Sequence, residues 1–220
     1  CGVSLPGPVN RQAGVCLFAP FLGIRDWHAA AELEERLGIP VFVENDVNAC
    51  AVAERSFGKA GDIHDFMWIT LSNGVGGAFY LNGSLYSGTN SCAGEFGHLR
   101  VEENGNLCSC GKSGCLETVA SGPAISDFYE RKTGLKRSAR EISQLAAEGD
   151  EAAIAAYKRA AKGLGSAIAQ ASTLLDVDVC YFGGGVAQSL ELFKDDLLAE
   201  IQDRLFQPVS KPVKIEYTGL

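Results

Sequence analysis

Three cysteines and one histidine have the spacing of ligands for a single metal ion. They are His98, Cys108, Cys110 and Cys115. Zinc prefers four tetrahedral thiolate and imidazole ligands, and ligands a few residues apart on a loop can surround it. Gly111 and Gly114 give this segment the backbone freedom that such a loop needs. A disulfide between Cys108 and Cys115 is the alternative, which a reducing compartment and the third nearby cysteine disfavour. We therefore predict a structural zinc ion, because four protein ligands close its coordination shell.

The other cysteines are scattered along the chain. They are Cys1, Cys16, Cys50, Cys92 and Cys180, and most have Ala, Val or Leu as neighbours. Free cysteine in such surroundings behaves as a small buried apolar residue. We predict buried thiols without redox chemistry at these positions, as expected in a reducing compartment.

A carboxylate stands between a short apolar strand and a helix. Asp46 follows the apolar segment 40–43 and precedes the alanine-rich segment 47–57. Sites of α/β proteins lie at the carboxyl ends of strands, where a carboxylate can accept the proton of a hydroxyl group. Aspartate is also a favoured N-cap of a helix. The residue type alone leaves both roles open.

Two glycine-rich segments follow predicted strands. Residues 71–77 read Leu-Ser-Asn-Gly-Val-Gly-Gly, and residues 183–185 are three glycines. Glycine-rich turns let backbone N–H groups approach phosphate oxygens closely. A common hairpin at the first segment and a tight strand-to-helix connection at the second are the plain alternatives.

The order of elements predicts an α/β protein. Strands are expected at 2–5, 40–43, 66–71, 78–81, 84–86, 98–101, 177–182 and 213–217. Helices are expected at 27–37, 47–57 and 189–205 and over most of 120–175, with a loop from Pro6 to Pro20. Strand and helix alternate over the first 60 residues, which implies a parallel sheet. Asn82-Gly83 predicts a hairpin turn.

Composition excludes several classes of protein. The chain has 220 residues and a formal net charge of −8. Because phosphate backbones are bound by clustered Lys and Arg, we expect no direct contact of this segment with nucleic acid. No apolar run approaches the roughly 18–20 residues that span a bilayer, and no secretory signal opens the chain. We expect a cytoplasmic protein without membrane contact.

Two of these motifs together resemble the signature of the ROK family, named for repressors, open reading frames and kinases. They are Gly-Glu-Phe-Gly-His at 94–98 and Cys-x-Cys-Gly-x-x-Gly-Cys-x-Glu at 108–117. The resemblance extends over nearly the whole chain. It implies a two-lobed α/β fold of the actin/hexokinase-like (ribonuclease H-like) type, here lacking the N-terminal part of its first lobe. Residues 1–60 would complete that lobe and residues 61–220 would form the C-terminal lobe.

The resemblance also assigns roles around a sugar. In ROK kinases the residue matching Asp46 is the catalytic base, and the one matching Asn45 contacts the sugar. The positions matching Glu95, His98 and Glu117 hydrogen-bond sugar hydroxyls, with the histidine bridging metal site and sugar. A zinc-bound imidazole has its second N–H free to donate, so zinc would orient a group that hydrogen-bonds the sugar. For Glu117, the plain alternative is a solvent-facing residue at a helix start.

The glycine segments acquire nucleotide roles in the same way. Asn73, Gly74, Gly76 and Gly77 resemble part of the second phosphate loop, and Gly183, Gly184 and Gly185 resemble the adenosine-binding turn. The implied cofactor is ATP with magnesium. Many kinases have Gly-Thr where this chain has Ser72-Asn73, and a further Gly where it has Ala78. These departures weaken the inference of ATP binding.

Two functions from different classes follow. The first is ATP-dependent phosphorylation of a hexose or N-acetylhexosamine at its primary hydroxyl. The second is a sugar-sensing transcriptional regulator whose DNA-binding domain lies outside this chain. The departures favour the regulator, and the intact Glu44-Asn45-Asp46 and glycines 183–185 favour the kinase. A zinc-stabilised domain with neither activity is a third possibility. The family also implies a homodimer or homotetramer.

One element of ROK kinases has no match here. They begin with an Asp-x-Gly-Gly-Thr phosphate loop, and nothing similar is found in these 220 residues. That aspartate would help to hold magnesium and the phosphates. We therefore expect residues 1–220 alone to transfer phosphate poorly or not at all.

Overall fold

A five-stranded mixed sheet is the centre of the computed structural model, which describes residues 1–19, 22–206 and 211–220. Its strand order is β10 (Lys214–Tyr217), β9 (Val179–Gly183), β6 (Phe66–Leu71), β7 (Val75–Leu81) and β8 (Ser84–Tyr86). The first three strands are parallel, and β7 and β8 continue as antiparallel hairpins. Strand β6 is buried along almost its whole length, as expected for a strand covered on both faces.

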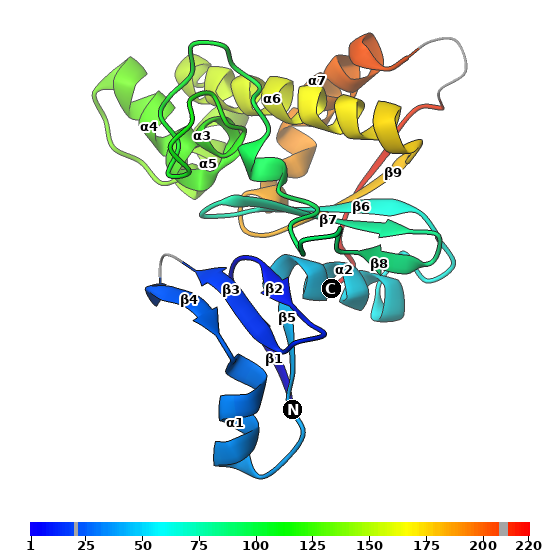
Figure 1. The fold of residues 1–220 in the computed structure, drawn as a ribbon. Helices are drawn as coiled ribbons and strands as arrows, with labels where there is room; N and C mark the ends of the chain where they lie inside the picture. Colours follow the sequence, from blue (N-terminus) through cyan, green and yellow to red (C-terminus); the bar gives the residue numbers. More distant parts are fainter. Residues whose placement is uncertain (20–21, 207–210) are drawn as a thin grey trace.

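Helices cover one face of this sheet (Figure 1). They are α3 (Glu117–Ala120), α4 (Gly122–Thr133), α5 (Ala139–Ala147), α6 (Glu151–Leu175) and α7 (Leu190–Arg204). Glycines in α6 allow neighbours to approach closely: a Cβ at Gly163 would lie 2.9 Å from Val119 of α3. Long as α6 is, no helix among the described residues is both long and apolar enough to cross a membrane.

Helix α2 (Asp46–Phe57) covers the other face of the sheet (Figure 1). Its Ala51 belongs to an apolar cluster with Phe66 and Trp68 of β6 and Tyr181 of β9. The helix begins directly after β5 (Phe42–Asn45), so its first turn lies at the carboxyl end of that strand. Packing on the sheet thereby fixes the position of Asp46. The lobe boundary predicted at residue 60 remains a prediction.

Two small sheets form the N-terminal part of the molecule. Strand β1 (Gly2–Leu5) pairs in parallel with β5, as the alternation of elements predicts. Helix α1 (Ala29–Leu37) ends at Gly38, whose φ of 68° is the left-handed conformation that glycine adopts readily. A three-stranded antiparallel sheet contains β2 (Val9–Asn10), β3 (Val15–Ala19) and β4 (Ile24–Trp27).

Several predictions from the sequence are wrong. The loop expected from Pro6 onward contains β2 and β3, and its last residue, Pro20, lies outside the described residues. The strand expected at 98–101 does not form: His98 ends the short 3-10 helix η2 (Phe96–His98), and of the next residues only Arg100 makes an isolated β-bridge, to Cys115 of the metal loop. Strand β7 begins at Val75 and so includes Gly76 and Gly77, which were expected in a turn.

The burial predicted for the five scattered cysteines is found at two of them. Cys16 and Cys180 are buried, whereas Cys1, Cys50 and Cys92 are exposed. Cys1 begins the chain, Cys50 is an exposed residue of α2, and Cys92 lies in the loop before η2. Burial raises the pKa of the Cys180 thiol, which favours its neutral form.

A buried carboxylate joins α2 to the C-terminal segment. Glu54 is fully buried. Its carboxylate accepts hydrogen bonds from the Lys59 backbone N–H at 2.7 Å and from the Thr218 hydroxyl at 2.5 Å. Residues 164 positions apart are thus connected, and the C-terminal end of α2 is fixed beside β10.

We expect Glu54→Ala to lower the free energy of unfolding by about 2–3 kcal/mol, because it leaves buried donors without an acceptor. Urea denaturation followed by circular dichroism measures this change. Glu35→Ala, at an exposed position of α1, is the matched control and should change stability by less than about 0.5 kcal/mol. Equal effects of the two substitutions would contradict the structural role of Glu54.

Candidate functional site

A cavity of about 440 Å³ lies where the N-terminal part meets the five-stranded sheet. It is lined by the turn at Pro6-Gly7-Pro8, the start of α2, the turn before β7, the loop before η2 and the first residue of α3. All five residues predicted to act on a sugar line it: Asn45, Asp46, Glu95, His98 and Glu117. So do Asn73, Gly74, Gly76 and Gly77 of the predicted phosphate loop. Residues separated by 72 positions in sequence therefore share one polar cavity.

Asp46 is exposed at the first position of α2. Its Oδ1 accepts hydrogen bonds from the Val47 backbone N–H at 3.0 Å and from the Asn45 side-chain amide at 3.1 Å. The alternative role considered for Asp46, the N-cap, is wrong. Asn45 is the N-cap, and its Oδ1 accepts from the backbone N–H groups of Val47 and Asn48. The Asp46 carboxylate is consequently oriented by its neighbours and accessible from the cavity.

Asn45 is occupied by these structural contacts. Besides Asp46, its amide group donates to the Gly7 carbonyl at 3.0 Å, which holds the Pro6-Gly7-Pro8 turn against α2. An asparagine side chain has two donor hydrogens and about two acceptor positions. All are used here, so a hydrogen bond from Asn45 to a sugar would have to displace one of them.

Glu44, which precedes Asn45, and Asn48, which follows in α2, had no predicted role, and the structure gives them one. Glu44 accepts a hydrogen bond from the side-chain amide of buried Asn48 at 3.0 Å and from the backbone N–H of Asn45 at 2.9 Å. Arg11 approaches the other oxygen of Glu44 at 3.8 Å. These contacts brace the strand-to-helix junction that carries Asp46.

Glu95 and His98 lie together in the cavity wall. The Nε2 of His98 is 3.8 Å from a carboxylate oxygen of Glu95. Partial burial raises the pKa of Glu95, the nearby His98 lowers it, and the Glu117 carboxylate raises it further. The carboxylates of Glu95, which precedes η2, and of Glu117, which begins α3, both line this cavity. Such a pair can accept hydrogen bonds from adjacent hydroxyl groups of one ligand.

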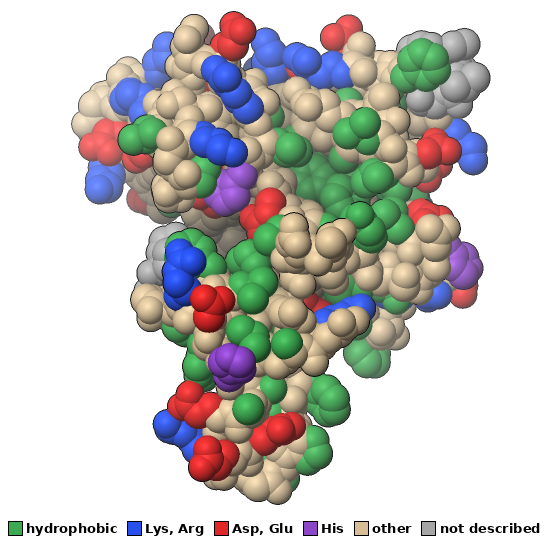
Figure 2. All heavy atoms as spheres, viewed as in Figure 1, with side chains coloured by type: hydrophobic (Ala, Val, Ile, Leu, Met, Phe, Trp, Pro, Cys, Tyr) green, Lys and Arg blue, Asp and Glu red, His purple; other side chains and the backbone are tan. Residues whose placement is uncertain are grey.

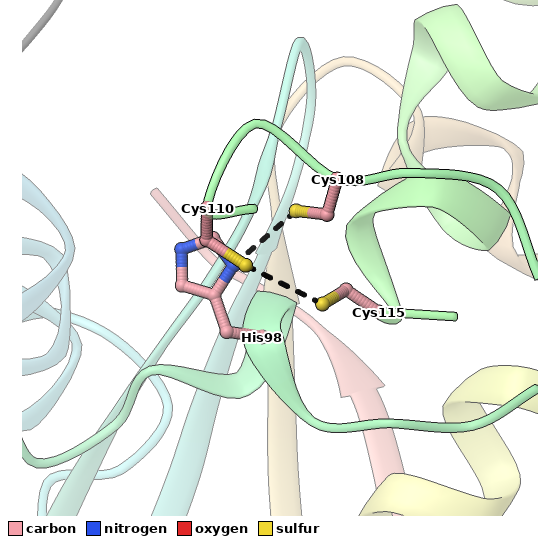
Figure 3. Close-up of side chains that lie close together, drawn as sticks. All are labelled: His98, Cys108, Cys110 and Cys115. Carbon is pink, nitrogen blue, oxygen red and sulfur yellow. Dashed lines mark hydrogen bonds between the residues drawn. The ribbon is translucent and has the colours of Figure 1, made fainter. Parts of the chain in front are cut away.

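His98, Cys108, Cys110 and Cys115 converge on one point (Figure 3). One ligand atom from each lies within 4.8 Å of all the others. The Sγ of Cys108 is 3.6 Å from His98 Nδ1, and the Sγ of Cys110 is 3.6 Å from that of Cys115. Thiolates about 2.3 Å from a tetrahedral zinc ion lie about 3.8 Å apart. The donor set and its spacing therefore fit zinc, with Nδ1 of His98 on the metal side and Nε2 facing Glu95.

The thiols of this cluster have unlike environments. Burial, together with the neighbouring thiols of Cys110 and Cys108, raises the pKa of Cys115 to about 12. A backbone hydrogen bond from Lys112 lowers the pKa of Cys110. A divalent cation favours deprotonated thiolates and would offset the unfavourable burial of Cys115.

The metal loop is held by its own backbone and by α6. Gly114 has a φ of 80°, and a Cβ there would lie 1.8 Å from the Glu102 carbonyl oxygen, so only glycine fits. Glu102 in turn accepts two hydrogen bonds from Arg159 of α6, at 2.8 and 2.7 Å. The loop is therefore fixed to the helical layer.

A second cavity of about 640 Å³ lies on the other side of the turn at Ser72-Asn73. Ser72, Asn73 and Gly185 of the predicted nucleotide segments line it. Its remaining wall was not predicted from the sequence and includes Pro123, Ser126, Ser138, Arg140, Gln144, Tyr157 and Gln188. Ser138 and Glu141 form a capping box, a signal that locates the start of α5 in the sequence but not the cavity beside it.

The remaining predicted glycines lie where neighbouring residues approach so closely that a side chain would not fit. A Cβ at Gly76 would lie 2.7 Å from Val47, and one at Gly77 would lie 2.2 Å from Phe96. Gly184 has a φ of 95° and passes so close to Leu71 that a Cβ would lie 2.4 Å from its carbonyl oxygen. Gly183 and Gly184 do not line the second cavity, which only Gly185 of the three reaches.

An apolar groove of about 320 Å³ adjoins the first cavity and shares Gly94 and Glu95 with it. Its other lining residues are Phe79, Phe96, Leu99, Gln170, Ala171, Leu174 and Leu175. Figure 2 shows hydrophobic side chains gathered in the middle of the face that it draws. Among the described residues that line the groove, only Glu95 and Gln170 have polar side chains, so it differs in character from the two polar cavities.

The sheet with helices on both of its faces is an α/β structure of the actin/hexokinase-like fold. Its two polar cavities meet at the turn Ser72-Asn73. The chain belongs to the ROK family, whose model matches residues 1–219. Its structure is similar to that of a ROK family transcriptional regulator, a homologue of the Escherichia coli MLC protein. The TM-score is 0.91 at 30% identity, over 99% of this chain and 57% of the regulator.

The chain is also similar to kinases of this family. A ROK family glucokinase from Streptomyces griseus, solved with glucose and AMPPNP, has a TM-score of 0.86 at 31% identity. That match covers 99% of this chain and 75% of the glucokinase. Glucokinase of Thermotoga maritima is 33% identical over 92% of this chain and 68% of its own length. A putative xylose repressor of Caldicellulosiruptor is 29% identical over the whole chain and 58% of its own length. The chain thus spans between half and three quarters of these relatives.

Proposed function

We propose that the protein is a kinase that transfers phosphate from ATP to the primary hydroxyl of a hexose or N-acetylhexosamine. The observation that carries this proposal is the accessible Asp46 carboxylate in a polar cavity that meets a second, larger cavity at Ser72-Asn73. The glucokinase relative that was solved with glucose and AMPPNP supports a sugar in the first cavity and a nucleotide in the second.

In this mechanism Asp46 accepts the proton of the sugar hydroxyl as its oxygen attacks the γ-phosphorus. The bond between that phosphorus and the bridging oxygen of ADP breaks, and ADP leaves. Glu95, His98 and Glu117 hold other hydroxyls of the sugar, so the reacting oxygen faces the Ser72-Asn73 turn. Ser72, Asn73 and Gly185 line the second cavity, where the phosphates would enter. Magnesium bound with ATP would neutralise phosphate charge.

Zinc would have a structural role in this function. With Nδ1 of His98 on the metal, Nε2 remains to donate to a sugar hydroxyl or to Glu95, 3.8 Å away. The ion would thereby fix the orientation of a sugar-binding imidazole. The resemblance to the ROK family also implies self-association as a homodimer or homotetramer, which light scattering would measure.

A sugar-responsive regulator is the second candidate. Ser72-Asn73 in place of the Gly-Thr of many kinases favours it, as does the similarity to the regulator with a TM-score of 0.91. In that case the first cavity would bind an effector sugar and no phosphate would be transferred.

A coupled assay of ATP consumption over a panel of hexoses and N-acetylhexosamines distinguishes the two. It requires the uninterrupted natural chain, together with calorimetry of sugar binding. Turnover with one sugar supports the kinase and identifies its substrate. Sugar binding without turnover would overturn the kinase and support the regulator.

A further inference from the structure

The turn Ser72-Asn73-Gly74, here called the shared turn, separates the two cavities. Ser72 and Asn73 line both of them, whereas Gly74 lines only the smaller one. A change in the position of this turn therefore alters both cavities at once. The contacts that hold it decide whether one cavity responds to the contents of the other.

Glu117 braces the shared turn from the sugar side. Its Oε2 accepts a hydrogen bond from the backbone N–H of Val75, the residue that follows the turn, at 3.3 Å. The same oxygen would lie 2.7 Å from a Cβ at Gly74, so the carboxylate rests directly against the turn. On the nucleotide side, the backbone N–H of Gly122 donates to the Ser72 carbonyl at 2.8 Å. Both braces come from one short segment, 117–122.

That segment is itself anchored to the metal loop. Glu117 begins α3 two residues after Cys115, and Thr118 donates from both its backbone N–H and its hydroxyl to the Cys115 carbonyl, at 2.9 and 2.8 Å. Leu116, between Cys115 and Glu117, is fully buried, and its backbone N–H donates to the Leu99 carbonyl at 2.9 Å. The backbone of Glu117 is thus fixed, and the contact of its side chain with Val75 restricts where the turn can lie.

We infer that Glu117 is a positioning residue for the shared turn and links occupancy of the sugar cavity to binding in the nucleotide cavity. A carboxylate has about four acceptor positions, so Glu117 can hold the Val75 N–H and a sugar hydroxyl simultaneously. A bound sugar excludes water and strengthens the remaining hydrogen bond to the turn. An ordered turn then binds phosphate with less loss of conformational entropy. The linkage rests on the proposed kinase function, whereas the positioning role does not.

Amide hydrogen exchange of Val75 in the natural chain tests the positioning role without any ligand. We expect exchange to accelerate about tenfold in Glu117→Ala, the factor that a hydrogen bond to a charged acceptor represents. Glu117→Gln keeps a carbonyl oxygen and should restore part of the protection. Glu95→Gln removes a carboxylate from the same cavity without touching the turn and should leave exchange at Val75 unchanged. Unaltered exchange in both Glu117 variants would overturn the positioning role.

Calorimetry with AMPPNP tests the linkage, with glucose and N-acetylglucosamine as the probe sugars. A saturating sugar should tighten AMPPNP binding to the wild type about fivefold or more. That ratio should approach one in Glu117→Ala and persist in Glu95→Gln, although both variants bind sugar more weakly. An unchanged ratio in Glu117→Ala would overturn the linkage. Absence of AMPPNP binding, with the exchange effect intact, would instead overturn the kinase and the linkage while leaving the positioning role.

Discussion

Asp46→Asn should reduce phosphoryl transfer by the natural chain about 100-fold to 10,000-fold, the range that a positioned general base contributes. The substituted amide can keep the contact with the Val47 N–H, because its oxygen can replace the Oδ1 that accepts it at 3.0 Å. It cannot take up the proton of the sugar hydroxyl. The loss should therefore appear in kcat, with sugar affinity changed by less than about threefold. The coupled ATP assay and calorimetry measure the two quantities separately.

The matched control is Asp62→Asn, which makes the same chemical change at an exposed position outside both cavities. It should retain wild-type turnover. Activity of Asp46→Asn within tenfold of the wild type would remove Asp46 as the general base. A large and equal loss of sugar binding in Asp46→Asn would give it a ligand-binding role instead.

The features that could be predicted from the sequence are those determined by short-range pattern. Helix α1 and its end at Gly38 follow from apolar spacing and a left-handed glycine. The cysteine cluster is local as well, since its three thiols come from eight consecutive residues and need only one turn of chain to meet. The family resemblance then named the residues from distant segments that line the sugar cavity.

Features that depend on non-local contacts could not be predicted. Strands β2 and β3 are short, and their pairing of Val9 with Cys16 gives no alternating pattern long enough to detect. Gly76 and Gly77 suggest a phosphate turn by composition, yet they lie in β7, where Val47 and Phe96 from other elements leave no room for a Cβ. The wall of the second cavity comes from α4, α5, α6 and η3 (Ala187–Ser189), which no motif connects.

The role of Asn45 illustrates why residue type is an incomplete guide. Its motif predicts a sugar contact, and the structure places it in the sugar cavity. Its hydrogen-bonding groups are nevertheless directed to the α2 backbone, Asp46 and Gly7. Asn45 therefore contributes to function by orienting Asp46, and this contribution is visible only in the three-dimensional structure.

Removal of one metal ligand should have the second large effect. We expect one zinc ion per wild-type chain by elemental analysis, and a loss of at least about 100-fold in zinc affinity in Cys110→Ser. Sugar affinity should fall about tenfold in this variant, because Nδ1 of His98 loses the metal that orients its ring. Cys110 is the suitable ligand to replace, since it is exposed while Cys108 and Cys115 are buried. Loss of core packing then contributes little to the result.

Cys50→Ser is the matched control, because Cys50 is also exposed but lies on α2, outside the cluster. It should keep both the zinc and the sugar affinity of the wild type. Treatment of the wild type with a zinc chelator should reproduce the sugar-binding defect of Cys110→Ser, and restored zinc should reverse it. Full sugar affinity in a zinc-free protein would separate the metal from the sugar cavity. The contact with Glu95 would then be enough to orient the His98 imidazole for sugar binding, and the metal would stabilise only its own loop.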